Sequence, residues 1–205
     1  MLWNSLTFAA KNDMPNYAYT SHHITGDANE VRKLHEALQR VDNHPEAAER
    51  EKEYYGHMWW GYVLQELLGH VPDLDCRGQV CDYGLDAESG ALSLFSESAW
   101  SAPFQIHEVL IQLFPSLRIL YFVDPDDDGL MLTNDVKGEV FTTRYGIATE
   151  DDDEQFFDTE EEMFRWFSNR FGIKVGCIDD VENAIIQLND EQDFSVNLHT
   201  CLVEE

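Results

Sequence analysis

Residues 117–123 read Leu-Arg-Ile-Leu-Tyr-Phe-Val, and this run is the strongest strand signal in the chain because branched apolar and aromatic residues dominate it. A helix is predicted just before it, opened by Pro103 and stopped by Pro115. The residues that share the apolar face of that helix are His107, Leu110, Ile111 and Phe114. Two short strands, near 130–133 and 139–145, are predicted to follow as a meander.

The first part of the chain predicts another strand and helix. Residues 17–25 alternate and are rich in aromatic and β-branched residues, which predicts a strand closed by Gly26. Asp27 then caps a helix, and Glu30 completes a capping-box pattern. The buried face predicted for this helix is Val31, Leu34, Leu38 and Val41.

A second helix is predicted from Pro45 to about residue 68, followed by strands over 79–85 and 91–98. The core side predicted for this second helix consists of Tyr55, Trp59, Tyr62, Val63 and Leu67. Trp60 and Tyr54 fall outside this side. Packing in the core is the favoured interpretation of these aromatic residues, and an exposed protein-binding anchor is the alternative, because Trp and Tyr dominate interface hot spots.

The order of elements predicts an α+β fold with a ferredoxin-like split βαβ antiparallel sheet and helices on one face over residues 14–146. Residues 147–205 are expected to form an acidic α/β extension packed on the same domain. Within it, Thr159 and Glu162 form a second capping box, and Gly172 ends that helix. A helix through Val181, Ala184, Ile185 and Leu188 precedes a closing strand through Phe194, Val196, Leu198 and Leu202. A linker is predicted over 148–160.

The segment Met14-Pro-Asn-Tyr-Ala-Tyr-Thr-Ser-His-His-Ile-Thr-Gly-Asp27 resembles the opening of the YubB-like family of plasmid and phage proteins. Trp100, Pro103 and the strand over 117–121, which leads to an acidic turn with proline, extend the resemblance over about residues 14–146. The resemblance implies a ferredoxin-like fold, an origin in a mobile element, and residues 1–13 as an N-terminal extension. It implies no catalytic residue.

The chain has 13 Lys and Arg against 40 Asp and Glu, a formal net charge of −27. This charge argues against direct binding to nucleic acid or to an anionic membrane, since both carry the same sign. The hydrophobic fraction of 43% is normal for a packed core. No apolar run approaches the roughly 18–20 residues that span a bilayer, and no signal-peptide pattern opens the sequence, so a cytoplasmic location is expected.

Residues 124–205 hold 23 acidic and 5 basic residues, hence −18, and 150–162 hold nine acidic residues in thirteen positions. We expect one continuous negative surface that docks on a basic protein, with Phe156 and Phe157 as apolar anchors or as core residues. The acidic residues assigned to this surface are Asp126, Asp127, Asp128, Glu150, Asp151, Asp152, Asp153, Glu154 and Asp158. The alternative is a solvated acidic loop that leads into a helix start.

A calcium loop is a second hypothesis. Asp124, Asp126, Asp128 and Asp135 occupy positions 1, 3, 5 and 12 of such a loop, with Gly129 at position 6. A strand precedes the loop, position 12 is the shorter Asp, and Pro125 stiffens position 2. The alternative is an acidic turn between two strands.

Cysteine and histidine residues form no strong motif. Cys76 and Cys81 are the one close cysteine pair, and Cys177 and Cys201 lie far away, so no zinc and four reduced thiols are predicted. His22 and His23 are neighbours in a strand and therefore point to opposite faces. One packed and one solvated histidine is the favoured interpretation, and a general base is the alternative.

These features predict a non-enzymatic interaction protein without cofactor that mimics DNA and occupies the basic site of a nucleic-acid-binding protein. With the resemblance, they predict a phage or plasmid protein that inhibits a host defence protein, such as a CRISPR or restriction effector, in the bacterial cytoplasm. The alternatives are a calcium-regulated binding module, and an enzyme of unrecognised type with His22 or His23 as its base.

Overall fold

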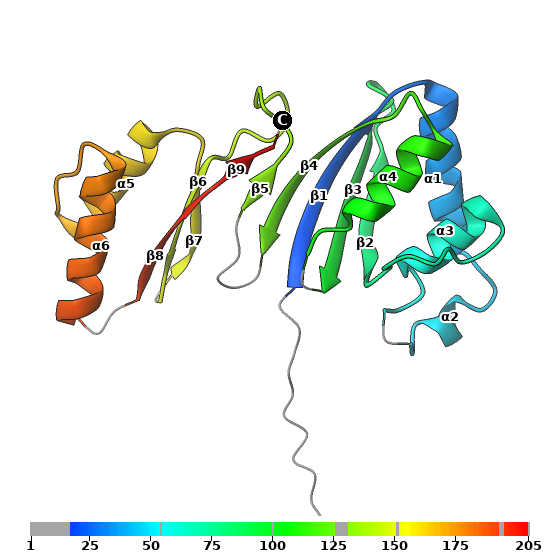
Figure 1. Cartoon of the computed structure of the whole chain (residues 1–205), viewed down its shortest axis with the longest axis horizontal. Coiled ribbons are helices and arrows are strands. Elements are labelled where there is room, and N and C mark those ends of the chain that lie inside the picture. The colour runs from blue at the N-terminus through cyan, green and yellow to red at the C-terminus, as the bar shows by residue number, and fades with distance from the viewer. Residues whose placement is uncertain are drawn as a thin grey trace, which may run out of the picture.

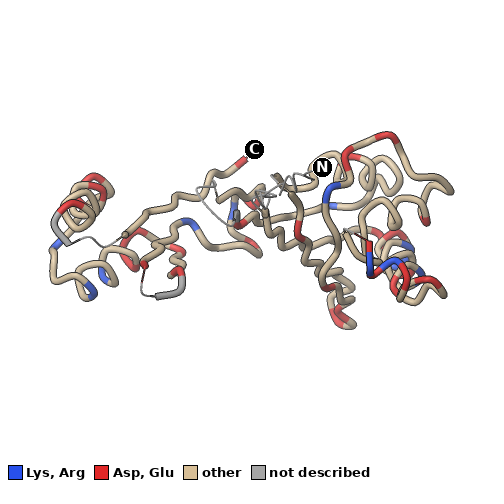
Figure 2. The backbone as a smooth tube through the Cα atoms, turned by 90° about the horizontal axis from the view of Figure 1, so that it is seen from below, with Lys and Arg blue, Asp and Glu red and all other residues tan. Residues whose placement is uncertain are grey.

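The computed structural model describes residues 17–53, 55–99, 101–125, 131–150, 152–192 and 195–204. Over these residues the chain has an α+β fold with a mixed six-stranded sheet, a three-stranded sheet and six helices. Figure 1 shows two lobes side by side, the first built on the larger sheet and the second on the smaller. Figure 2 shows that the molecule is elongated, with a narrow junction between the lobes.

The strands of the larger sheet are β1 (Tyr17–Thr25), β2 (Gly78–Leu85), β3 (Leu92–Ala99), β4 (Arg118–Pro125), β5 (Leu132–Thr133) and β9 (Leu202–Val203). Their order is β2-β3-β1-β4-β5-β9. Neighbouring strands from β2 to β5 are antiparallel, and β9 runs parallel to β5. The strand predicted over 117–123 is β4, beside the central β1, so that prediction is confirmed.

Three helices pack on one face of the larger sheet: α1 (Ala28–Asp42), α3 (Trp60–Leu68) and α4 (Phe104–Leu113). Buried and half-buried residues alternate along β1, because every second side chain faces these helices. The four residues predicted for the buried face of α1 are all buried: Val31, Leu34, Leu38 and Val41.

One half of the capping box predicted for α1 is confirmed. The carboxylate of Asp27 accepts the N–H groups of Asn29 (2.9 Å) and Glu30 (3.4 Å). The second half of the capping box is wrong, because the Glu30 carboxylate accepts the N–H and the hydroxyl of Ser116 (3.0 and 2.7 Å). The N–H of Asp27 donates to the same hydroxyl (2.8 Å), so Ser116 ties the start of α1 to the turn before β4.

The single helix predicted from Pro45 to residue 68 is wrong. The structure has a short α2 (Ala47–Arg50), then turns up to Trp59, and then α3. Gly56 supports these turns with a φ of +66°. Trp60, predicted outside the core side, is 1% exposed because it opens a new helix and packs in the first lobe's core. Tyr54 lies outside the described residues.

The face predicted for α4 is correct at three of four positions. His107, Leu110 and Phe114 are buried, but Ile111 is 44% exposed. Ile106 takes its place at 1% exposure, because at 100° per residue it lies nearer the centre of the buried face.

The second lobe contains β6 (Tyr145–Thr149), β7 (Asp152–Phe157), α5 (Glu160–Phe171), α6 (Ile178–Gln192) and β8 (Val196–Thr200). Its antiparallel sheet has the order β7-β6-β8, and the two helices pack on one face around a core separate from that of the first lobe. The Thr159 hydroxyl accepts the N–H of Glu162 (3.3 Å), as predicted. Gly172 ends α5 in the left-handed conformation, also as predicted.

Two predictions around the junction are wrong. The linker predicted over 148–160 contains β7, which pairs with β6. The strand predicted over 139–145 begins only at Tyr145. The strand starts late because the carboxylate of Asp135 holds the preceding residues in a turn. It accepts the backbone N–H groups of Glu139 (3.0 Å), Val140 (2.7 Å) and Phe141 (2.9 Å).

The last strand joins the two sheets. β8 pairs with β6, and the chain then continues through Cys201 into β9, which pairs with β5. At this passage the N–H of Cys201 donates to the carbonyl of Arg144, and the N–H of Leu202 donates to that of Met131 (both 2.8 Å). The domain boundary expected after residue 146 falls inside β6.

Candidate protein-binding surface

A groove of about 530 Å³ lies between α6, the strand β8 and Met131 at the junction of the lobes. α6 contributes Glu182, Ile185, Ile186 and Asn189, and β8 contributes all five of its residues. The groove therefore combines an apolar wall, a carboxylate and the edge of a sheet.

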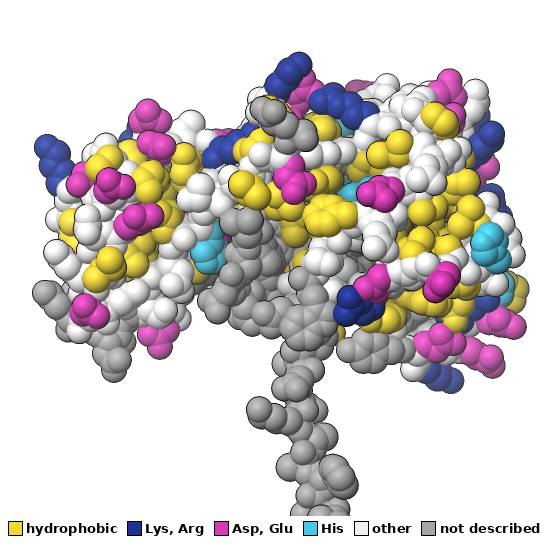
Figure 3. All heavy atoms as spheres, in the orientation of Figure 1, with side chains coloured by type: hydrophobic (Ala, Val, Ile, Leu, Met, Phe, Trp, Pro, Cys, Tyr) yellow, Lys and Arg dark blue, Asp and Glu magenta, His cyan; other side chains and the backbone are white. Residues whose placement is uncertain are grey.

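Ile186 is 58% exposed beside this groove, on a helix whose other apolar residues face the core. Glu182 and Asp190 lie one turn before and one turn after it, and both are exposed. α6 contains no basic residue. Figure 3 shows acidic and apolar side chains side by side over this helix. Single exposed apolar residues are common on protein surfaces, so it is the groove beside Ile186, together with the acidic stripe, that makes this face a candidate contact.

The acidic residues predicted for a partner surface are only partly placed. Glu150 and Asp158 are exposed at the two ends of β7. Asp126, Asp127, Asp128 and Asp151 lie outside the described residues, as do the side chains of Asp152 and Asp153. Glu154 is half-buried, and its Oε1 lies 2.9 Å from Nδ1 of His199. Glu154 is therefore paired within the lobe.

β7 separates the two predicted anchors. Phe157 is 9% exposed and packs in the second lobe's core, whereas Phe156 is 44% exposed on the other face. The two acidic segments also belong to different sheets, because Asp124 lies on β4 and Glu154 on β7. Most of the acidic residues predicted to join the two segments lie outside the described residues, so one continuous surface stays a prediction.

Asp135, the twelfth position of the predicted calcium loop, already accepts hydrogen bonds from the backbone. Asp135 is 1% exposed, and both its carboxylate oxygens accept backbone N–H groups. Burial alone would raise the pKa of Asp135, but these hydrogen bonds hold it below its usual value. Asp135 therefore serves the turn that follows it, and a calcium ion would have to displace those bonds.

His22 and His23 point to opposite faces of β1 and His22 is buried, as predicted, whereas His23 is half-buried and not fully solvated. Nδ1 of His22 donates to the carbonyl of Leu94 (3.3 Å), so its Nε2 accepts from Nε2 of His107 (2.9 Å). Burial and the neighbouring His107 lower the pKa of His22 to about 3, and burial lowers that of His107 to about 4. Both rings are neutral core residues at pH 7. His23 lines a separate hollow of about 360 Å³ with Asp82 and Phe95.

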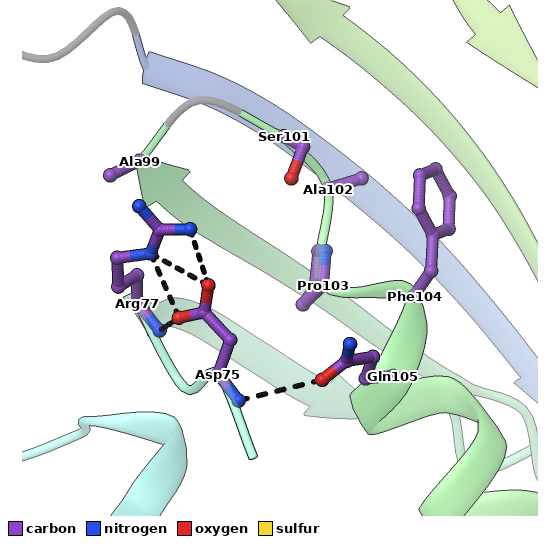
Figure 4. A pocket seen from close by; sticks show the side chains of 8 residues that line it. All are labelled: Asp75, Arg77, Ala99, Ser101, Ala102, Pro103, Phe104 and Gln105. Carbon is purple, nitrogen blue, oxygen red and sulfur yellow. Dashed lines mark hydrogen bonds and ion pairs between the residues drawn. The ribbon is translucent and has the colours of Figure 1, made fainter.

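Two other polar clusters are already paired within the chain. The first is a hollow of about 270 Å³ at the start of α4. Figure 4 shows the side chains that line it, among which the guanidinium of Arg77 donates to both carboxylate oxygens of Asp75 (Nε to Oδ1 2.8 Å and to Oδ2 2.7 Å). In the other, His57 lies between Glu51 and Asp42, and the hydrogen bond to Glu51 is the main cause that raises its pKa. A charged ligand would have to displace an existing partner at either place.

The four cysteines are free thiols. Cys76 and Cys201 are buried, and Cys81 and Cys177 are exposed. Burial raises the pKa of Cys76 to about 11, which makes it a weak nucleophile. Within the described residues, no three His, Cys, Asp or Glu side chains are grouped so that they could hold a metal ion.

Comparisons with known proteins add no relative. No family model, no curated protein and no solved structure matches this chain. The resemblance to the YubB-like family therefore stays a prediction based on the residues quoted for it. No helix in the described part of the chain has the length and apolar character needed to cross a bilayer.

The groove was missed at the sequence level, although one signal for it exists. The apolar stripe predicted for α6 leaves Ile186 as an apolar residue outside the stripe. Such a residue between Glu182 and Asp190 predicts an exposed apolar side chain on an acidic face once the helix is known. The contribution of β8 carries no local signal, because it depends on which strand lies at the edge of the sheet.

Proposed function

We propose that this chain is a non-enzymatic interaction protein that binds a basic, nucleic-acid-binding protein through the acidic surface of its second lobe. The observation that carries the proposal is charge: residues 145–205 hold 17 acidic and 3 basic residues, hence −14. This is more than the net charge of about 2–8 that keeps a small domain soluble.

The position of the charges supports binding at long range. Exposed carboxylates occur at the start of α5 and along α6, on an ordered lobe with its own core. A negative field of this kind steers a basic partner and raises the association rate, as the phosphates of a nucleic acid would. The carboxylates thereby compete for the site that a nucleic acid occupies.

The non-enzymatic character of the proposal rests on the polar clusters. His22 and His107 are buried and neutral, and Arg77 and His57 are held by carboxylates of the chain. A host defence effector is the partner that we infer from the negative charge together with the mobile-element origin that the YubB-like resemblance implies.

The fold assignment belongs to the same proposal. β1 to β4 follow the order β2-β3-β1-β4 with antiparallel neighbours, and α1 and α4 lie in the connections from β1 to β2 and from β3 to β4. This connectivity supports a ferredoxin-like split βαβ arrangement for the first lobe.

The test compares two triple variants with equal loss of charge. The first changes α6 (Asp179→Asn, Glu182→Gln and Asp190→Asn), and the control changes exposed acids of the first lobe (Glu49→Gln, Glu88→Gln and Glu108→Gln). The partner is first captured from bacterial lysate at low salt and identified. Stopped-flow association is then measured as a function of ionic strength, together with competition by the partner's nucleic acid.

We expect the α6 variant to associate several-fold more slowly and with a flatter salt dependence, and the control to stay close to the parent. Nucleic acid and this chain should exclude each other on the partner. Equal rates for the α6 variant and the parent at low salt, or simultaneous binding of nucleic acid, would contradict the proposal.

A further inference from the structure

The strand β8 forms an edge of the three-stranded sheet. The N–H of Glu150 donates to the carbonyl of Ser195 (3.0 Å), and that of Cys201 donates to the carbonyl of Arg144 (2.8 Å). In an antiparallel ladder the residues that point to the partner strand alternate with those that point away. The backbone N–H and C=O groups of Asn197 and His199 therefore point toward β6. Those of Val196, Leu198 and Thr200 point away from β6, toward the open edge of the sheet.

The outward backbone groups of Val196 are already hydrogen-bonded to a side chain, in the way a neighbouring strand would bond them. The amide of Asn189 on α6 donates to the carbonyl of Val196 (3.0 Å) and accepts its N–H (2.9 Å). For Leu198 and Thr200, no hydrogen bond joins the outward groups to the described part of the chain. Each of these two residues presents one donor and one acceptor to the groove beside α6.

The walls of the groove suit an extended chain. A strand placed beside β8 alternates its side chains between the two faces of the sheet. On the helix face they would meet Ile186 and Glu182, and on the opposite face His199. An apolar residue and a basic residue of the incoming segment would thus find an apolar and an acidic counterpart.

We propose that β8 accepts an extended, basic segment of the partner as an added strand, paired with Leu198 and Thr200 and covered by α6. This inference rests on the proposed function and specifies its mode of recognition. Strand addition derives affinity from backbone hydrogen bonds and specificity from the alternating side chains.

The charge of the lobe decides between a basic partner and a second copy of this chain. Pairing of two β8 edges would bring together two lobes with a net charge of −14 each. Such like charges oppose association. A basic segment finds the opposite field, and Glu182 lies in the groove to receive a lysine or arginine.

The probe is a fluorescein-labelled peptide of alternating arginine and valine, six residues long. Its matched control has the same sequence with N-methyl groups at alternate residues, which removes N–H donors while keeping the charge. On the protein side, Thr200→Pro removes one outward N–H and adds a ring at the edge, which an edge strand tolerates. Thr200→Val keeps the N–H and is its control. Near-UV circular dichroism checks that both variants are folded.

We expect the unmodified peptide to bind the parent, and the N-methylated peptide to bind about tenfold more weakly. Thr200→Pro should lose about the same factor, while Thr200→Val stays within about twofold. Amide hydrogen exchange of Leu198 should slow when the unmodified peptide is added. The two peptides test the same contact on the unaltered protein if Thr200→Pro fails to fold.

Equal binding of both peptides, abolished by Glu182→Gln or by high salt, would overturn strand addition and leave the proposed function standing. Protection of the Leu198 and Thr200 amides in the free protein would overturn it as well, because the edge would then be filled from within the chain. Failure of the unmodified peptide to bind at low salt would overturn the inference, whereas the proposed function fails only if the captured partner is not basic or does not compete with nucleic acid.

Discussion

The two lobes use their carboxylates in different ways. In the first lobe, acidic side chains hold the fold: Asp27 caps α1, Asp135 organises a turn, and Arg118 pairs with Glu139 (2.9 Å). In the second lobe, α6 exposes acidic residues and offers them no basic neighbour of its own. The first 144 residues hold 23 acidic and 10 basic residues, hence −13, while the last 61 alone hold −14.

This difference indicates a division of labour. Self-repulsion destabilises a compact lobe, so a high unpaired charge on a small core persists only where it serves another purpose. The first lobe has the larger core and the more balanced charge, and under the proposed function the second lobe supplies the negative field that steers the partner. If this division is real, the two lobes should respond separately to core substitutions and to pH.

The largest expected effect comes from the second lobe's core. Phe167 is fully buried there, so Phe167→Ala should cost about 3–5 kcal/mol. Because the two cores are separate clusters, we expect the loss of protection to be confined to residues 145–200. Hydrogen exchange in increasing denaturant measures each lobe separately.

Trp60→Ala in the first lobe's core is the matched variant and should act on the first lobe. If either substitution lowers protection equally in both lobes, the chain unfolds as one cooperative unit, and the division into two lobes has no energetic meaning.

Lowering the pH should destabilise the first lobe and leave the stability of the second lobe unchanged. The pKa values of His22 and His107, about 3 and about 4, lie below the unfolded value of 6.5, so the unfolded state binds more protons as the pH falls below 6.5. At pH 5.5 each ring should therefore destabilise the first lobe, by an amount on the order of 1 kcal/mol. Chemical denaturation followed by lobe-resolved exchange at pH 7.5 and 5.5 measures this.

The second lobe has no comparable buried histidine among its described residues, since His199 is half-buried and paired with Glu154. We expect it to keep its stability over this pH range. A His22→Phe, His107→Phe variant should remove this loss of stability, and the raised pKa of His57 should then leave the first lobe somewhat more stable as the pH falls. An unchanged slope in that variant would assign the effect to other groups.

Local patterns predicted the elements whose causes are local. The alternation over 17–25 and the four-residue face of α1 follow directly from side-chain periodicity. The N-cap at Asp27 and the left-handed Gly172 are likewise decided within a few residues. Each of these predictions is confirmed.

The wrong predictions depend on pairing partners that local composition does not reveal, whether they lie close in the sequence or far away. The run from Glu150 to Glu154 has the composition of a loop, yet it leads into β7 because β6 offers it a partner. Glu30 bonds to Ser116, 86 residues away, instead of completing its capping box. The groove beside β8 has the same origin, since only the strand order makes β8 an edge.

A smaller effect is expected from the turn that leads into the second lobe. Asp135→Asn replaces one acceptor oxygen by an amide group facing the backbone N–H groups of Val140 and Phe141. Losing these bonds should cost about 1–3 kcal/mol. Thermal unfolding measures the loss, and exchange of the Glu139, Val140 and Phe141 amides locates it. Faster exchange spread evenly over both lobes would contradict a local role.

The smallest effect on stability should come from Ile186, and its neighbour provides the control. Ile185 is 9% exposed in the core of the second lobe, so Ile185→Ala should cost about 2–5 kcal/mol. Ile186 is 58% exposed, so Ile186→Ala should change the free energy of unfolding by no more than about 0.5 kcal/mol. The same truncation one position along the same helix thus separates the core face from the groove face.

If Ile186 anchors a partner, Ile186→Ala should weaken binding of that partner far more than its effect on stability explains, because truncation of an interface hot spot costs about 2 kcal/mol or more. Isothermal titration with the captured partner measures the binding loss beside chemical denaturation of the same sample. An Ile186→Ala protein that binds as tightly as the parent would show that the groove beside α6 is not where the partner docks, and that the charge of the second lobe acts elsewhere on its surface.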